Sequence, residues 1–431
     1  MSLPEAQGGT RHAPRTRRAP RRRIEDAALA GLPGRLTATS TGTAAGPVDP
    51  DATDDVRTVA VLSPTTGAHL LDVEDASPDV LRDDLSAAAD ASRADWAWSS
   101  GEDRARHLFA LADVLTGHTL ALAVTAALTT GRPVALGTSR DAPDLLDAAF
   151  SAAGWADKLA VLGLRAAPGA ITLAADWRTP VADLLTGAFA VLATGRAAVL
   201  HPDPPVAATC ARLVLAADEA GLPPGLLRVV PSRTARTPEV PPAADVVLAG
   251  ADTDAAAAHL LDVLAAGATG RPGGTRVLVH ESLAADLLGR LETGVAALRV
   301  GDPLDRATQV GPSPTPDLAR AATGARARPV AVPQALPHGG WWALPAVVAA
   351  GPRSAPVPAG PLLAVRTVRS GAEALSLLAA APPVELTLWG TRPGGLDPWR
   401  ALDGVARIGV DTAAVPDRRG DALRVLRGAR G

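Results

Sequence analysis

The side chains that could carry chemistry in this sequence include a single thiol. Cys210 is the only cysteine among 431 residues, so neither an intramolecular disulfide nor a multi-cysteine metal site can form within the chain. A thiolate is a strong nucleophile, but the residues around Cys210 predict an apolar helix, on which a small thiol usually serves packing. We therefore predict a structural role for Cys210.

Histidine offers no metal site by its spacing. No two of the eight histidines have the separation of a zinc finger or of a metal-binding helix. They are His12, His69, His107, His118, His201, His259, His280 and His338. We expect no metal centre.

Two groups of residues could bind anions. Four glycines, Gly267, Gly270, Gly273 and Gly274, look like a phosphate loop. They follow a predicted helix rather than a strand and lack the P-loop lysine, which favours a simple turn. Seven arginines between residues 11 and 23 could bind nucleic acid or an acidic partner, but such like-charge blocks are usually solvated tails. We favour the tail and expect no nucleic-acid partner.

The composition indicates a large folded protein. Hydrophobic residues make up 47% and charged residues 20%, which excludes a wholly disordered chain. The formal net charge of −3 does not suit binding of the whole molecule to nucleic acid or to an anionic membrane. The longest apolar run, 120–128, is about half of what a membrane-spanning helix needs. We expect no membrane association and a cytoplasmic location.

The elements that must position any site alternate along the chain. Residues 1–55 have no recurring apolar face and predict a disordered basic, Pro/Gly-rich arm. Helical periodicity over 79–98 and 102–115 is followed by short strand-like runs that alternate with helices. This alternation predicts a parallel sheet with helices on its faces.

Seven blocks, in order, resemble the aldehyde dehydrogenase superfamily. Each block is weak alone, but the order over residues 56–412 is specific. The blocks are Val61–Gly67, Arg106–Leu115 with Gly131–Pro133, Gly154–Lys158, Ala193–Pro202, Ala220–Val230, Val300–Pro312 and Gly340–Pro361. The resemblance implies an α/β fold with a Rossmann-like cofactor-type domain and a second, catalytic-type α/β domain.

The resemblance also implies a domain order. An eroded cofactor-type domain is expected over 56–240, with the family's protruding hairpin shortened near 159–176. The catalytic-type domain follows over 245–400, and residues 401–431 return to the first domain.

The chemistry that the resemblance implies is missing at each catalytic position. The position of the family's nucleophilic cysteine falls at or beside Arg271 and Pro272, and a protonated guanidinium cannot attack an aldehyde. The oxyanion-stabilising asparagine is replaced by Arg178. The only candidate for the general base is Glu239, which two prolines follow in place of the family's glycines.

Cofactor binding is expected to be lost as well, so that no residue is a confident cofactor ligand. Trp177 is a vestige of the family's site motif. His201 replaces the lysine that binds the adenosine ribose, and Val357 replaces the glutamate that holds the nicotinamide ribose. Between Val230 and Glu239 the chain is too short for the strand and helix that normally hold the pyrophosphate.

Three functions follow as hypotheses. The first is a catalytically inactive pseudoenzyme that acts as a structural or regulatory subunit and needs no cofactor. The second is an active NAD(P)-dependent aldehyde dehydrogenase with atypical site residues. The third is a small-molecule binder that reuses the aldehyde tunnel, with Trp177, Trp341 and Trp342 as candidate lining residues.

The predicted partner is a second protein chain. A heteromer with an active aldehyde dehydrogenase is expected ahead of a homodimer. The apolar helix 255–266 is the predicted contact, because a large apolar face is rarely left in water.

Overall fold

The structure is a computed structural model, and it describes most of the chain between residues 35 and 411. The described residues are 29, 32, 35–42, 57–164, 166–177, 179, 181–235, 243–267, 275–324, 336, 338–350, 360–383, 385–391, 395–403, 405 and 407–411. Contacts divide the chain into residues 1–31 and 32–431, and the fold below is that of the second unit.

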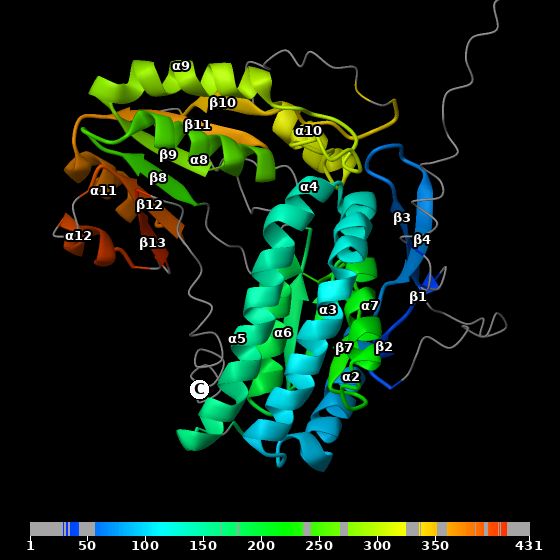
Figure 1. Cartoon of the computed structure of the whole chain (residues 1–431). Coiled ribbons are helices and arrows are strands. Elements are labelled where there is room, and N and C mark those ends of the chain that lie inside the picture. Colours follow the sequence, from blue (N-terminus) through cyan, green and yellow to red (C-terminus); the bar gives the residue numbers. More distant parts are fainter. Residues whose placement is uncertain are drawn as a thin grey trace, which may run out of the picture. The chain divides into compact units, whose positions relative to one another are not determined.

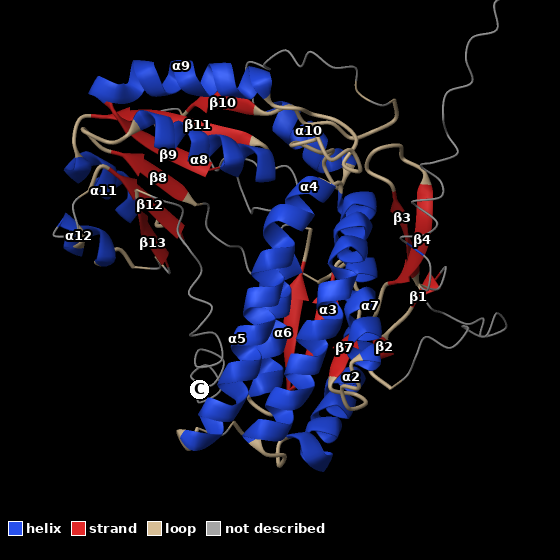
Figure 2. Cartoon of the chain, viewed as in Figure 1, coloured by secondary structure: helices blue, strands red, loops and turns tan. Residues whose placement is uncertain are grey.

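Thirteen strands of the described part form three sheets (Figures 1 and 2). The first sheet has the order β1-β4-β3, with β1 at Arg35–Leu36, β3 at Thr58–Leu62 and β4 at His69–Glu74. The second has the order β2-β7-β6-β5, with β2 at Thr39–Ser40, β5 at Ala170–Ala175, β6 at Ala197–Pro202 and β7 at Leu227–Val229.

The third sheet has six strands in the order β10-β11-β9-β8-β12-β13, all parallel. Its strands are β8 at Ala244–Val247, β9 at Thr275–His280, β10 at Ala346–Ala349, β11 at Leu362–Val368, β12 at Glu385–Trp389 and β13 at Arg407–Val410. The parallel pairing of β5, β6 and β7 and of this sheet confirms the predicted α/β class.

Helices connect these strands. The longer ones are α2 (Pro78–Ala91), α3 (Gly101–Thr130), α5 (Ala142–Val161), α6 (Val181–Ala193), α7 (Pro204–Glu219), α8 (Thr253–Ala266) and α9 (Glu281–Ala297). The shorter ones are α4 (Val134–Leu136), α10 (Pro316–Gly324), α11 (Gly371–Ala379) and α12 (Asp397–Arg400), with single π-helical turns η1 (Ser92–Trp96) and η2 (Gly137–Asp141).

Helix α3 shows how the local sequence sets an element. It begins after Ser100, whose hydroxyl accepts the N–H of Asp103, and it ends at Gly131, whose φ of 79° suits glycine. By length and composition α3 could also cross a membrane, with a mean hydropathy of 1.6 over 18 residues. In the fold it packs against α5, α6 and α7.

The core of the second sheet is covered by two helical layers. Helices α6 and α7 contact the strands, and α3 and α5 pack over them (Figure 2). The cluster of buried side chains there includes all of β6 from Ala197 to Leu200 and much of α6. A second cluster joins α8, α9 and the six-stranded sheet.

Three described segments bear on the expected domain organisation. Within the predicted disordered arm 1–55, residues 35–36 and 39–40 form β1 and β2, which pair with β4 and β7. Residues 159–176 contain the end of α5 and then β5, which pairs in parallel with β6, so their described part forms no hairpin. In the expected return segment 401–431, the described residues 407–410 form β13 at the edge of the six-stranded sheet beside β12, and residues 412–431 lie outside the described part. Ile408 and Val410 pack into the apolar cluster of that sheet, which explains this placement.

The predicted partner-binding helix is also covered within the chain. Ala256, Leu260 and Leu264 of α8 are buried in a cluster with α9 and β11. The apolar face of residues 255–266 is therefore part of the core rather than an open contact surface.

Candidate functional site

Several of the predicted site residues lie outside the part of the chain that the structure describes. These are Arg178, Glu239, Arg271 and Val357. Trp177 and His201 are described, and both lie at the carboxyl edge of the β5-β6-β7 sheet, where open α/β sheets bind ligands.

The edge itself is tied together by short-range contacts. The backbone N–H of Trp177, just after β5, donates to Oδ2 of Asp203 at 3.2 Å. Asp203 is the residue that precedes α7, so this bond joins the ends of two neighbouring strands.

His201 is a buried residue that joins β6 to the chain after β7. Its ring is 8% exposed, and Nδ1 lies 2.6 Å from the carbonyl oxygen of Val230. Because a carbonyl can only accept, Nδ1 must carry the proton. Burial lowers the pKa of His201, so its neutral form is favoured. This geometry describes a packing residue, not the long flexible cation that binds a ribose.

The lowered pKa of His201 makes stability depend on pH. As the pH falls below the ordinary histidine pKa, the unfolded chain takes up the proton more readily than the folded one, so the folded state loses stability. We expect His201→Asn to reduce the loss of unfolding free energy between pH 7 and pH 5, measured by urea titration. A His201→Asn protein with the same slope as the wild type would contradict this expectation.

The start of α7 is poorly suited to an anion. Pro204 and Pro205 occupy the first positions of the helix, and proline has no N–H to donate. The pyrophosphate of a dinucleotide commonly uses such N–H groups at a helix N-terminus. The described residues therefore do not fit a dinucleotide cradle at this edge.

The only thiol lies inside α7. Cys210 is 1% exposed, and burial raises its pKa far above the ordinary value, with the charge of Asp203 adding to the effect. The thiol therefore stays protonated at neutral pH, which confirms Cys210 as a buried packing residue and leaves it inert as a nucleophile.

We expect this inertness to be measurable. In the folded protein Cys210 should react with a disulfide reagent on the order of 100-fold more slowly than in urea, because both burial and the raised pKa deplete the thiolate. The absorbance of the released thiol reports the rate. A rapid stoichiometric reaction of the native protein would contradict the buried placement.

A pocket of about 330 Å³ lies beside this edge. Its walls come from β3, the start of α7, Arg233, the start of α10 and Trp341. Trp342 instead packs beside the apolar cluster of the six-stranded sheet, and Trp177 does not line the pocket. The three tryptophans proposed as tunnel residues are therefore not gathered in this pocket.

The motif blocks that the structure does bring together meet through their backbones. A Cβ atom on Gly311 would overlap the carbonyl oxygen of Gly131, and the N–H of Val134 donates to Pro303 O at 2.8 Å. In the same way, Trp341 N–H donates to Pro64 O at 3.0 Å. These motif blocks therefore stabilise the fold through backbone contacts and do not position reacting groups.

Two buried polar groups were missed by the sequence analysis. Nε and Nη2 of Arg132 donate to the two carboxylate oxygens of Asp141 at 2.5 and 2.7 Å. Asp245, 1% exposed, accepts from Trp389 Nε1 at 3.2 Å and lies 3.2 Å from His259 Nε2. The second group joins residues 144 positions apart, so no local pattern could indicate it.

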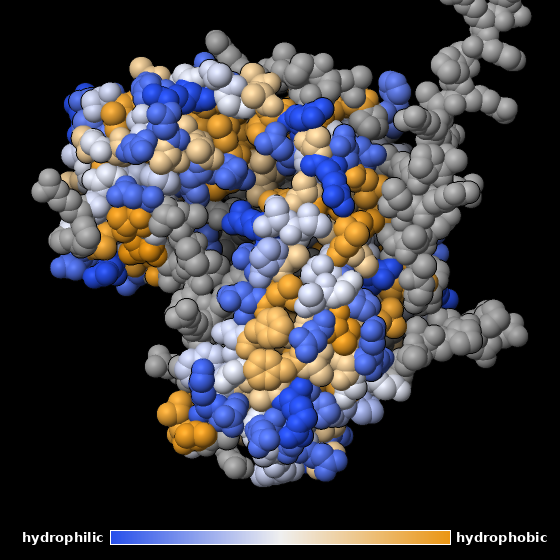
Figure 3. Space-filling model, in the orientation of Figure 1, coloured by the Kyte–Doolittle hydropathy of each residue, from blue (hydrophilic) through white to orange (hydrophobic). Residues whose placement is uncertain are grey.

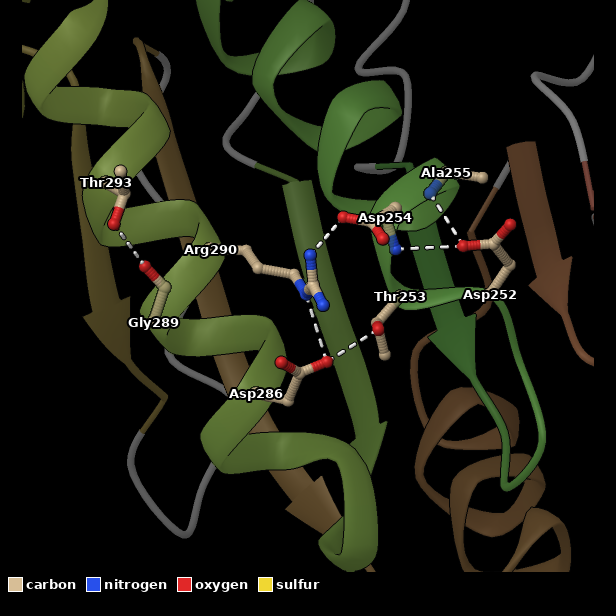
Figure 4. A network of polar contacts seen from close by, with 8 residues as sticks. All are labelled: Asp252, Thr253, Asp254, Ala255, Asp286, Gly289, Arg290 and Thr293. Atoms are coloured by element: carbon tan, nitrogen blue, oxygen red, sulfur yellow. Dashed lines mark hydrogen bonds and ion pairs between the residues drawn. The ribbon is translucent and has the colours of Figure 1, made fainter.

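A surface network joins α8 to α9 (Figure 4). Arg290 on α9 pairs with Asp286 at 3.0 Å and with Asp254, while Thr253 donates to Asp286 at 2.6 Å. These exposed groups position two helices. Among the described residues no cluster of histidine, cysteine or carboxylates could hold a metal ion.

Parallel sheets flanked by helices, with Trp177 and His201 at the carboxyl edge of one of them, define an α/β protein. A family model described as "Aldehyde dehydrogenase family" matches residues 51–240 and 243–378, so the chain belongs to the aldehyde dehydrogenase family.

Among its relatives, a betaine aldehyde dehydrogenase of Cereibacter sphaeroides is 27% identical over 306 residues, which cover 60% of this chain and 63% of the relative. An aminoacetaldehyde dehydrogenase of Pseudomonas aeruginosa is 31% identical over 190 residues, or 41% of this chain and 38% of the relative. The chain thus spans less than two thirds of the length of these curated relatives.

Solved structures agree on the fold. An NAD-dependent aldehyde dehydrogenase from Sinorhizobium meliloti matches with a TM-score of 0.73 and 21% identity, covering 91% of this chain and 88% of that one. The aldehyde dehydrogenase KauB from Pseudomonas aeruginosa matches with a TM-score of 0.73 and 20% identity, covering 90% and 91%.

Proposed function

We propose that this chain is a catalytically inactive member of its family, which serves as a structural or regulatory subunit in the cytoplasm. The observation that carries the proposal is the burial of the only thiol, Cys210, at 1% exposure inside α7. The family's reaction needs a thiolate at the aldehyde carbon, and no cysteine stands at or beside Arg271 and Pro272, where the resemblance places it.

The cofactor side supports the same proposal. His201 Nδ1 is hydrogen-bonded to the carbonyl oxygen of Val230. At the start of α7, Pro204 and Pro205 have no N–H to donate. The last strand of the β5-β6-β7 sheet ends at Val229, and β8 of the other sheet begins at Ala244. This connection is too short for another strand–helix–strand unit that could complete a dinucleotide site.

The alternative is an active NAD(P)-dependent enzyme, which the names of the relatives favour. The two hypotheses differ in one assay. We expect the purified chain to form no NADH or NADPH above background at 340 nm with betaine aldehyde or aminoacetaldehyde, while the betaine aldehyde dehydrogenase of Cereibacter sphaeroides serves as the positive control.

Arg271→Cys should not restore activity, because groups that act as a unit are strongly non-additive. NAD⁺ and NADP⁺ should also leave the melting temperature of the chain unchanged. Turnover that scales with the amount of this chain would overturn the proposal in favour of the active enzyme, and its loss in Cys210→Ser would assign the nucleophile to Cys210.

A further inference from the structure

The exposed large apolar side chains of the described residues gather on one pair of helices. Phe109 and Leu120 lie on α3, Phe150 and Val161 on α5, and Trp98 and Leu162 next to the ends of these helices. Helices α3 and α5 pack side by side (Figure 1), and Figure 3 shows orange and tan surface over them between blue patches. Soluble monomers rarely gather exposed apolar side chains in this way.

An aromatic pair stands in the middle of this α3–α5 face. The rings of Phe109 and Phe150 lie 6.2 Å apart, and the two residues are 41% and 40% exposed. Asp113 lies one turn after Phe109, and Asp147 lies one turn before Phe150. Helices α3 and α5 run in opposite directions (Figure 1), so the turn after Phe109 and the turn before Phe150 lie toward the same end of the face.

The carboxylates of Asp113 and Asp147 lie toward one end of the face, and the cations Arg106 and Lys158 lie toward the other. Among the described residues neither Asp113 nor Asp147 takes part in an ion pair, although both are exposed. Toward the other end of the face, Arg106 already pairs with Glu102 and Asp103 of its own helix. A second copy that stacked the ends with Asp113 and Asp147 on each other would bring unpaired carboxylates together, which weakens association.

We propose that the α3–α5 face is a docking surface for a basic amphipathic helix of a partner protein. Apolar side chains of that helix would cover Phe109 and Phe150, and its arginines or lysines would pair with Asp113 and Asp147. From Glu102 to Leu120 the face is about 27 Å long, which accommodates a helix of about five turns.

This inference names the partner chemistry of the proposed subunit role and rests on that role. Its test uses binding alone, so a failure would leave the loss of catalysis untouched. The proposal requires that affinity depend both on the aromatic pair and on the sign of the charge beside it.

The experiment uses two labelled helical peptides of 18 residues with identical leucine positions, one flanked by arginine and the other by glutamate. Fluorescence anisotropy with the full chain at low salt measures their affinities. We expect the arginine peptide to bind at least about tenfold more tightly than the glutamate peptide, with the difference shrinking at high salt.

Three variants separate the contributions. The double variant with Asp113→Asn and Asp147→Asn should bind the arginine peptide about fivefold or more less tightly than the wild type does. It should bind the glutamate peptide at least as tightly as the wild type does. The double variant with Phe109→Ser and Phe150→Ser should bind both peptides less tightly. The matched control is Asp79→Asn with Asp83→Asn on α2, also exposed, which should change neither affinity. All variants alter exposed side chains, and circular dichroism checks their folding.

Equal affinity for the two peptides, or an unchanged affinity in the Asp113→Asn and Asp147→Asn variant, would overturn the proposal. Sedimentation of the chain alone provides the other outcome. A dimer that the Phe109→Ser and Phe150→Ser variant dissociates would assign the face to a second copy and also overturn it.

Discussion

Asp141→Asn is expected to destabilise the protein by about 3–5 kcal/mol, the usual cost of removing one partner from a buried ion pair. The side chains of Arg132 and Asp141 are only 7% and 15% exposed, and the pair is bidentate. With asparagine at 141 the guanidinium stays buried and charged without a counter-charge. Urea unfolding followed by circular dichroism measures the change.

The control separates the lost pair from the altered shape. Arg132→Met combined with Asp141→Leu removes both charges and should cost far less than Asp141→Asn alone, because neither charge remains buried. Asp90→Asn breaks the exposed pair with Arg93 and should cost less than about 1 kcal/mol. If the single and double variants at 132 and 141 were equally unstable, packing rather than charge would explain the loss.

The parts of the fold that were predicted correctly depend on local pattern. Alternating strand-like and helix-like runs predict parallel sheets, and β5, β6 and β7 pair in that way. The predicted helix 102–115 is the first half of α3, which begins after Ser100 and continues to Thr130. The position of β13 at the edge of its sheet could not be predicted from local pattern. It depends on which strand of the assembled sheet has no neighbour on one side.

The sequence could predict which residue types are present at the candidate site, but not how those residues are arranged in space. The absence of a second cysteine is readable from the sequence, and the structure adds that Cys210 is buried. That His201 bonds to the Val230 carbonyl, 29 positions away, depends on the pairing of β6 with β7. The burial of α8 likewise depends on α9 and β11, so an apolar helix face alone could not indicate an interface.

The second large effect is expected at Gly311, where an alanine should cost about 3 kcal/mol through overpacking. The added methyl group would overlap the backbone oxygen of Gly131, and a backbone atom cannot move aside as a flexible side chain can. The contact joins the end of α3 to the segment after α9. Since the hydrogen bond from Val134 to Pro303 lies in the same contact, strain there should loosen both segments.

The matched control for Gly311→Ala is Gly117→Ala, because a Cβ atom at Gly117 has no neighbour within 4 Å and the residue is exposed within α3. That substitution should stabilise the protein by about 0.5–1 kcal/mol, since alanine is the better helix former. Urea unfolding of both variants, with hydrogen exchange at Val134, measures the two effects. A Gly311→Ala protein as stable as the wild type would show that the two segments do not pack backbone against backbone.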